Sequence, residues 1–315
     1  MINTSIISGL IKQKAKEYCF ALCGFSKAEI LVKEEIYFKK WLDEKKNAGM
    51  NWLNNSFEKR VNPFLVMPET KSIISLAFIY DTPYQHIEDK SIAKISRYAW
   101  GEKDYHKVIK KKLKPLCAEI ELLSPEIKTR AYVDDGPMMD KIWAARSGIG
   151  AMGKHTNIIN PAIGSFFFLC EILINVELEY DKPIEEDLCK NCTLCVNACP
   201  TGAIYDEYKL DANLCISYQT IENRGEIPEF INLDNWIYGC DTCQDVCPYN
   251  SRNVFTEDER FFPKKETLNK SLEELSKLPE EEFNKLFEGT PVRRTKYAGW
   301  KRNIEKNLKR DIKNI

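Results

Sequence analysis

Two patterns of hydrophobic spacing alternate along the first 180 residues. Apolar residues recur at helical spacing and predict helices over residues 6–20, 34–48, 104–123 and 138–147. Runs rich in β-branched and aromatic residues predict buried strands over residues 72–80, 127–134 and 164–178. Helices mixed with strands in this order predict a layered α/β (α+β) domain.

The pattern changes after residue 180. Residues 180–187 are acidic and contain a proline, which is typical of a connector, and the cysteine-dense region that follows extends to residue 252. Residues 253–315 predict two or three short amphipathic helices. We therefore expect domains at 1–180, 181–252 and 253–315.

Composition narrows the class of protein. The 315 residues are 43% hydrophobic and 30% charged, as in soluble globular proteins. No apolar run approaches the roughly 18 residues that would span a bilayer, and the N-terminus lacks a small-residue cleavage site. We expect a cytoplasmic protein with no membrane partner. Thiols stay reduced in that compartment, so clustered cysteines more often bind metal than form disulfides.

Two cysteine motifs, each closed by a proline, are the strongest chemical signal. The first has the spacing C-x2-C-x2-C-x3-C-P, in which three thiolates reach one [4Fe–4S] cluster and the fourth ligates another. In the second, C-x2-C-x3-C-P, Val246 stands where one ligand would complete the motif. The crossing rule then predicts one cluster on Cys189, Cys192, Cys195 and Cys247. The other cluster takes the remaining cysteines of the region: Cys199, Cys215, Cys240 and Cys243.

Zinc and disulfides explain this pattern less well. Zinc sites use four ligands in paired C-x2-C units and have no need of a C-x2-C-x2-C loop. Four further cysteines lie outside the region, and we expect them to be small buried hydrophobic residues: Cys19, Cys23, Cys117 and Cys170.

Positive charge gathers in two segments of a chain whose net charge is only −1. Residues 291–315 hold nine Lys or Arg against two acids, and residues 106–114 form a second basic run on a predicted helix. A solvated lysine-rich face explains either run alone. Together they make a polyanionic partner plausible, because each neutralised phosphate releases counterions.

The chain resembles the epoxyqueuosine reductase family, cobalamin-dependent enzymes that perform the last step of queuosine synthesis on tRNA. The resemblance covers nearly the whole chain and rests on residues 97–113 (RYAWGEKDYHKVIKKKL), residues 133–156, the two cysteine motifs with "CISY" between them, and residues 289–304. It implies base-off cobalamin held between an N-terminal α/β domain and a ferredoxin-like domain. It further implies that the two clusters deliver electrons for reducing epoxyqueuosine to queuosine at the wobble position of the anticodon loop.

The resemblance also assigns residues to the reaction. It makes Asp134 the proton donor, with Tyr105 and His106 beside it, and an apolar pocket lined by the cofactor would keep this acid protonated. An acid before Gly-Pro is otherwise a turn former or helix cap. Asp135 departs from the family pattern, which has a small residue there, so the identity of the donating acid stays open between the two neighbours.

Further contacts are implied around the cofactor. They involve the following residues: Arg60, Arg97, Asp134, Ile158, Leu169 and Ser217. For the five residues other than Asp134, plain packing or surface exposure is at least as good an explanation. The motif D-x-H-x-x-G, typical of histidine-on cobalamin binding, begins at Asp104 but lacks its glycine, which favours an open lower cobalt face. Ala151 and His155 stand where relatives commonly have tryptophan and asparagine, so the pocket can differ there.

The basic tail gains a role from the same resemblance. Five residues are expected to contact phosphates of the anticodon stem: Arg293, Arg294, Lys296, Lys301 and Arg302. The expected electron donor is a flavodoxin or ferredoxin. Two alternatives remain: a corrinoid reductive dehalogenase, against which the missing export signal and the basic tail weigh, and a non-enzymatic ferredoxin-type electron carrier.

Overall fold

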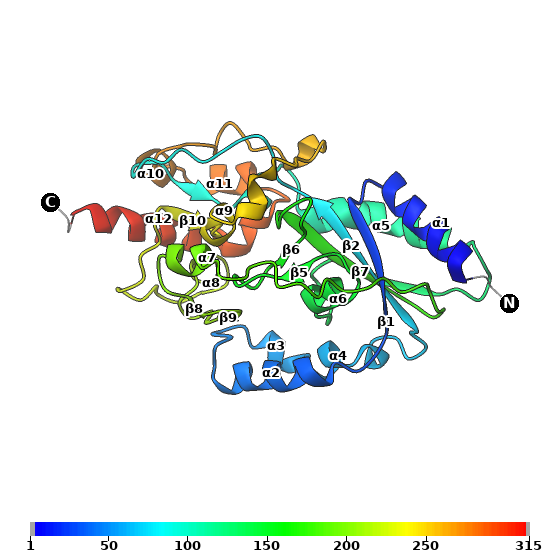
Figure 1. The fold of residues 1–315 in the computed structure, drawn as a ribbon. Coiled ribbons are helices and arrows are strands. Elements are labelled where there is room, and N and C mark those ends of the chain that lie inside the picture. Colours follow the sequence, from blue (N-terminus) through cyan, green and yellow to red (C-terminus); the bar gives the residue numbers. More distant parts are fainter. Residues whose placement is uncertain (1–3, 313–315) are drawn as a thin grey trace.

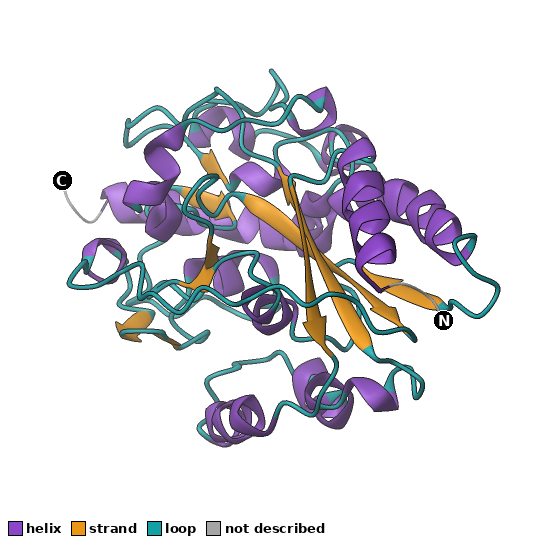
Figure 2. Ribbon diagram, turned by 45° about the vertical axis from the view of Figure 1, so that its right-hand side comes forward, coloured by secondary structure: helices purple, strands orange, loops and turns teal. Residues whose placement is uncertain are grey.

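An antiparallel four-stranded sheet lies at the centre of the first half of the chain. The computed structural model describes residues 4–312. The strands lie side by side in the order β1 (Leu22–Lys27), β2 (Ser72–Ile79), β7 (Phe167–Ile174), β4 (Thr129–Tyr132). β2 and β7 pair along their full lengths and form the middle of the sheet, whose twist is visible in Figure 2.

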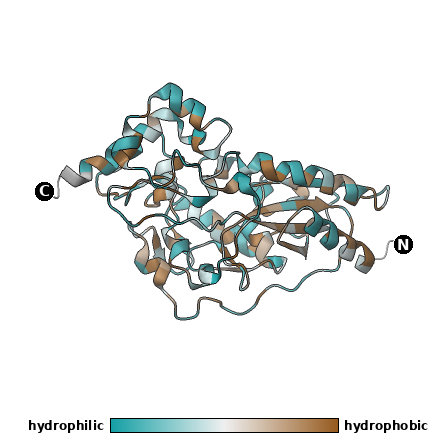
Figure 3. Cartoon of the chain, turned by 90° about the horizontal axis from the view of Figure 1, so that it is seen from above, coloured by the Kyte–Doolittle hydropathy of each residue, from teal (hydrophilic) through white to brown (hydrophobic). Residues whose placement is uncertain are grey.

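Two helices cover one face of this sheet, α1 (Thr4–Glu17) and α5 (Tyr105–Glu121). The Asp104 side chain caps α5 by accepting a hydrogen bond of 2.9 Å from the His106 N–H. The buried side chains of α5 recur at helical spacing and pack into the largest core of the molecule: Val108, Ile109, Leu113, Leu116 and Ile120. In Figure 3 the strands are largely hydrophobic, whereas the long helices alternate between polar and apolar positions.

Shorter helices cover the opposite face. They are α2 (Val32–Asp43), α3 (Trp52–Asn55), α4 (Phe57–Val61) and α6 (Asp140–Arg146), with a 3-10 turn at Pro63–Leu65. Successive side chains of a strand point to opposite faces. Phe168, Cys170 and Ile172 of β7 therefore pack in the core under α5, whereas Leu169 and Leu173 pack on the side of α6. Glu171 shares the α6 side with these two leucines.

The cysteine-rich region is built from short elements around two loops (left half of Figure 1). Its helices are α7 (Leu194–Ala198), α8 (Ile216–Ile221) and α9 (Thr242–Asp245), with a 3-10 turn at Pro248–Arg252. Small two-stranded pairs join β5 (Ala151–Met152) to β6 (Ile158–Ile159), and β8 (Ile204–Asp206) to β9 (Lys209–Leu210). A third pair is parallel and joins β3 (Lys94–Ile95) to β10 (Trp236–Tyr238), so an early segment is built into this later region.

The C-terminal part packs as a small helical core. Two 3-10 turns, Arg97–Ala99 and Glu259–Phe261, precede α10 (Leu272–Ser276) and α11 (Glu280–Leu286); the 3-10 turn Pro291–Thr295 leads into α12 (Lys296–Ile312). Aromatic rings hold this core together: Phe283, Phe287, Tyr297 and Trp300. Ala93, Ile95 and Trp100 from the first half of the chain are packed into the same cluster.

The predicted helices and strands of the first half are present, with their ends shifted by a few residues. β1 was not predicted, because Gly24 and Ser26 interrupt its hydrophobic run. The expectation of short C-terminal helices was wrong for α12, which has 17 residues. Cys170 is buried as expected, but Cys19 is exposed at the end of α1, with a φ of 65°. No helix within residues 4–312 is long and apolar enough to cross a membrane.

Candidate active site

The eight cysteines of the two motifs gather into two groups of four in the structure. In the first group, Cys189, Cys192 and Cys247 lie close enough to Cys195 that their charges raise the pKa of its thiol, in addition to the larger effect of burial. In the second group, burial is the largest cause that raises the pKa of Cys243. The nearby charges of Cys240, Cys215 and Cys199 raise it further. α7 and α9, which carry cysteines of the first and second motif, pack side by side. The assignment of the eight cysteines to two clusters stays a prediction.

The donor set of each group fits a [4Fe–4S] cluster. The backbone N–H of Lys154 lies 3.5 Å from the Cys189 sulfur, a contact of the kind that tunes cluster potentials. Within residues 4–312 no three His, Cys, Asp or Glu side chains are arranged to hold a single metal ion. A cubane differs, because each of its four thiolates binds a different iron and the ligands stand farther apart than around one ion.

Asp134 stands at the end of β4 and is fixed by a tyrosine from α5. Its backbone has a φ of 52°, a left-handed conformation that turns the chain sharply out of the strand. The Tyr105 hydroxyl donates a hydrogen bond of 2.7 Å to the Asp134 Oδ2. Burial and the neighbouring Asp134 raise the pKa of Tyr105, so the hydroxyl keeps its proton and remains a donor. The Tyr105 ring is stacked on Phe168, with centroids 4.2 Å apart.

The neighbouring acid, Asp135, has a different environment. Its Oδ1 accepts a hydrogen bond of 3.1 Å from the Val133 N–H, and Lys110 forms an ion pair with its other oxygen. Partial burial alone would raise the pKa of Asp135, but the hydrogen bonds from Lys110 and Val133 outweigh it and lower this pKa. Asp135 therefore stays ionised. Asp134 instead accepts its hydrogen bond from the Tyr105 hydroxyl, and the side chains of both acids are exposed. The expected apolar shielding of Asp134 is not provided by the chain alone.

Lys141 links the acid to the second cysteine group, and sequence reasoning missed it. Its Nζ donates hydrogen bonds of 2.9 Å to the Thr156 O and the Asn157 Oδ1. Desolvation lowers the pKa of Lys141, while the negative charges of Asp134, Cys243 and Cys215 oppose the shift. The side chain nevertheless remains accessible to solvent. These charge effects place Lys141 near both Asp134 and the second cysteine group.

His106 and Arg60 flank the same acid. The His106 Nδ1 lies 2.7 Å from the Asp104 Oδ1, and the imidazole ring is stacked beside Tyr105. Arg60 donates hydrogen bonds of 2.8 Å to the Ser56 Oγ and 2.9 Å to the Met138 O. Desolvation lowers the pKa of Arg60, and the negative charges of Asp140 and Asp134 partly offset this shift. The Arg60 guanidinium therefore lies near both acids.

The remaining residues implied around the cofactor lie between the sheet and the cysteine region. Ile158 of β6 is buried in a small apolar cluster that the half-buried Leu169 of β7 also joins. Ser217 is half-buried in α8, two residues after Cys215. His155 is 3% exposed, and its Nε2 has no hydrogen-bond partner among the described residues.

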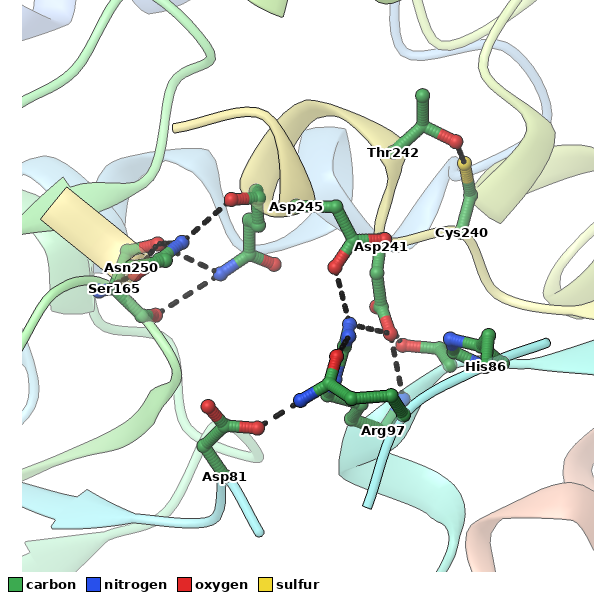
Figure 4. A network of polar contacts seen from close by, with 12 residues as sticks. Asp81, His86, Arg97, Ser165, Cys240, Asp241, Thr242, Asp245 and Asn250 are labelled. Atoms are coloured by element: carbon green, nitrogen blue, oxygen red, sulfur yellow. Dashed lines mark hydrogen bonds and ion pairs between the residues drawn. The ribbon is translucent and has the colours of Figure 1, made fainter. Parts of the chain in front are cut away.

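The resemblance implies that Arg97 contacts the corrin, but in this structure its guanidinium is paired with carboxylates of the protein. The guanidinium is 6% exposed and pairs with Asp81 at 3.5 Å, with Asp241 at 3.4 Å and, more closely, with Asp245 (Figure 4). Asp241 also accepts a hydrogen bond of 2.8 Å from the Arg97 backbone N–H. Asp241 and Asp245 belong to the second cysteine motif, so the side chain ties this loop to the first half of the chain. Any corrin contact would compete with these carboxylates.

The five basic residues expected to bind tRNA are not equally available. Arg293, Arg294 and Lys296 are exposed, although Arg294 forms a two-pronged ion pair with Glu222 at 2.6 and 3.1 Å. Lys301 is half-buried. Arg302 is used inside the fold, because its guanidinium donates to three backbone carbonyls at 2.6–2.8 Å: those of Gln219, Asn223 and Gly225. The Arg302 guanidinium thus anchors α12 on α8 and on the loop that follows it, and its contact with tRNA stays a prediction.

Comparisons with known proteins identify the family of the chain. A family model described as "Epoxyqueuosine reductase QueG, DUF1730" matches residues 60–135, and a "4Fe-4S double cluster binding domain" matches residues 188–250. An epoxyqueuosine reductase of Cellulophaga algicola is 42% identical over 95% of this chain and 97% of its own length. That of Escherichia coli is 37% identical over 93% of this chain and 78% of its own length.

Solved structures give the same result. The chain superposes with a TM-score of 0.86 and 31% identity on an epoxyqueuosine reductase crystallised with an epoxyqueuosine-modified tRNA stem loop, covering 97% of this chain and 82% of that one. The Bacillus subtilis enzyme, in a structure with its aspartate catalytic loop swung out of the active site, matches with a TM-score of 0.86, 30% identity and the same coverage. These identities extend over nearly the whole length, and the chain belongs to the epoxyqueuosine reductase family.

Proposed function

We propose that this protein reduces epoxyqueuosine to queuosine in the anticodon loop of tRNA, using cobalamin and two [4Fe–4S] clusters. The observation that carries the proposal is the position of Lys141, which senses the charges of both Asp134, held by Tyr105, and the second group of cysteines. A ferredoxin-type carrier needs no such acid. A dehalogenase is not favoured, because the relatives that match over nearly the whole chain are epoxyqueuosine reductases.

The two cysteine groups would hold the clusters. The first cluster is assigned to Cys189, Cys192, Cys195 and Cys247, and the second to Cys199, Cys215, Cys240 and Cys243. Because Lys141 lies near both Asp134 and the second group, we propose that the second cluster is the one that passes electrons to the cofactor. The first is then the entry point for an external donor, which we propose to be a flavodoxin or ferredoxin in the cytoplasm.

The residues proposed to hold a corrin come from the sheet side and from the cysteine region. Arg60 and Lys141 would offer cations for its polar periphery, and Ile158, Leu169 and Ser217 would lie along its apolar face through side chain or backbone. Bound cobalamin supplies reducing power at the epoxide carbon, which protein side chains lack. The proposed domains are 1–180 for the cofactor, 181–252 with a ferredoxin-like fold for the clusters, and 253–315 for tRNA.

Asp134 is proposed as the proton donor to the oxygen that leaves the epoxide. Tyr105 fixes its orientation, and cofactor and substrate would cover its exposed side. His106 is held by Asp104 next to Tyr105 and can hydrogen-bond the flipped base. Asp135 is unsuited, because Lys110 keeps it ionised. Arg293, Arg294 and Lys296 present exposed charge to the anticodon stem, and Lys301 and Arg302 support the same surface.

The direct test is an anaerobic assay on tRNA from cells blocked at this step, followed by nucleoside mass spectrometry. Reconstituted protein with cobalamin should convert epoxyqueuosine to queuosine, and protein without cobalamin should not. Replacing Cys215 by alanine should lower the iron content from about eight to about four atoms per chain, because one cluster loses a ligand. Retention of the full iron content in Cys215→Ala would refute the ligand assignment, and conversion without cobalamin would refute the proposed chemistry.

A further inference from the structure

A glutamate is buried without a partner in the middle of the central sheet. Glu171 of β7 is 0% exposed, and neither of its carboxyl oxygens has a hydrogen-bond partner among the described residues. In the sheet it stands opposite Ser75 of β2 and Tyr132 of β4, on the face covered by α6. An ionised carboxylate in such a place is very unfavourable, so the group is expected to carry a proton.

A second carboxyl comes from α6, which packs on β7. After burial, the charge of Asp140, at the start of α6, is the next cause that raises the pKa of Glu171, and the buried Oδ1 of Asp140 likewise has no hydrogen-bond partner among the described residues. Burial raises the pKa of Asp140 to about 6 and that of Glu171 well above its ordinary range. Near neutral pH the pair therefore holds one proton, on Glu171, beside an ionised Asp140.

The charged groups around this pair connect it to the proposed proton donor. Asp134 from the end of β4 raises the pKa of both carboxyls, and Arg60 from α4 lowers that of Asp140. Lys141 adjoins Asp140 on α6 and senses the charges of both Asp134 and Asp140. The other titratable neighbours are Tyr132 opposite Glu171 and Cys170 beside it in β7. Two cations therefore flank the path between Asp140 and Asp134.

The reaction needs more protons than one acid holds. Removing an epoxide oxygen breaks two C–O bonds, forms one C=C bond and releases water, which consumes two electrons and two protons. The electrons come from the clusters of the proposed function, on which this inference rests. Asp134 gives one proton and then stands as a carboxylate beneath cofactor and substrate. A second proton must reach it from inside the protein.

We propose that Asp140 and Glu171 form a proton relay that reloads Asp134 during turnover. Asp140, which is ionised at neutral pH, accepts the proton of Glu171 and passes it to the Asp134 carboxylate, directly or through one water molecule. Glu171 ends the turnover ionised and takes up a proton from solvent when the cleft reopens. Neither residue touches the substrate, and both act through Asp134.

The pH dependence of Glu171→Gln distinguishes this role from a structural one. Below pH 6 Asp140 holds a proton of its own, so kcat of the variant should approach that of the wild type. About two pH units higher, Asp140 is ionised and kcat should be at least about tenfold lower than wild type. Ser75→Ala, which changes the residue opposite Glu171 without removing a proton, should follow the wild-type profile. A loss that is equal at every pH, or shared by Ser75→Ala, would overturn the relay.

Infrared spectroscopy of the cofactor-free protein tests the stored proton separately from the reaction. Wild type and Ser75→Ala should show the carbonyl band of a buried protonated carboxyl at neutral pH, and Glu171→Gln should lack it. Absence of the band in wild type overturns the relay but leaves the proposed function standing. Conversely, the band without any tRNA conversion counts against the proposed function. If Glu171→Gln does not fold, Asp140→Asn serves instead, with kcat reduced at every pH but the band retained.

Discussion

Two acidic clusters in different parts of the molecule differ in how their carboxyl groups are paired. Around Arg97, the carboxylates of Asp81, Asp241 and Asp245 accept hydrogen bonds or ion pairs from the guanidinium, the Arg97 N–H and the Ser96 hydroxyl. In the second cluster, Glu171 and the Oδ1 of Asp140 have no such partner among residues 4–312. Burial of carboxyl groups therefore leads to an ionic cross-link around Arg97, where a cation is paired with them. Around Glu171 it leads to a stored proton.

The positions of the two clusters fit these roles. The Arg97 cluster joins the segment before α5 to the loop that carries Cys240, Cys243 and Cys247, where rigid geometry matters. The carboxyl pair lies behind Asp134, where a proton can be used. A buried ion pair with satisfied hydrogen bonds contributes to specificity of structure, whereas an uncompensated carboxyl is usually retained for function.

The largest effect is expected from breaking the ionic cross-link. Arg97→Gln leaves three carboxylates without their cation and should lower the free energy of unfolding by about 3–5 kcal/mol, as for other broken buried pairs. The measurement is urea unfolding under anaerobic conditions, with Arg97→Lys as control. Lysine keeps the charge but loses the planar fork, so its loss should be smaller. If Arg97→Gln were as stable as wild type, the ion pairs of Arg97 would not stabilise the fold.

A change of the opposite sign is expected at the unpaired carboxyl. Glu171→Met removes a buried acid while filling similar volume, and should stabilise the fold by roughly 1–4 kcal/mol in the same urea experiment. The variant should also lose tRNA conversion above neutral pH, because the stored proton is gone. Destabilisation on this substitution would mean that Glu171 has a structural partner, and the contrast between the two clusters would fail.

A smaller, pH-dependent effect is expected at Asp81. Burial raises the pKa of Asp81 to about 6, although Arg97 opposes the shift. The native state therefore binds a proton that the unfolded chain has released, between the ordinary Asp pKa and pH 6. Stability should fall as pH rises through this window, by roughly 1–2 kcal/mol after allowing for partial exposure, and then level off. Asp81→Asn should lack this component in urea titrations at several pH values; an unchanged pH profile would contradict the assignment.

The sequence predicted the parts of the site that have fixed spacing. The cysteine motifs predicted two groups of four because the C-x2-C-x2-C-x3-C loop has a restricted geometry. Asp134 and Tyr105 came from the resemblance. Lys141 and Glu171 were missed, because a lysine on a short helix and a lone glutamate within an apolar strand show no pattern of their own. Arg302 looked like its exposed neighbours, and only its contacts with the loop after α8 show the difference.

The most direct test of the central claim compares two adjacent acids. Asp134→Asn and Asp135→Asn would each be reconstituted with iron, sulfide and cobalamin and assayed anaerobically on epoxyqueuosine-containing tRNA. Both should bind the cofactors. Asp134→Asn should convert the nucleoside about 10²–10⁴-fold more slowly, because a positioned general acid is lost, whereas Asp135→Asn should stay near wild type. Wild-type turnover by Asp134→Asn, or an equal loss in both variants, would contradict the account.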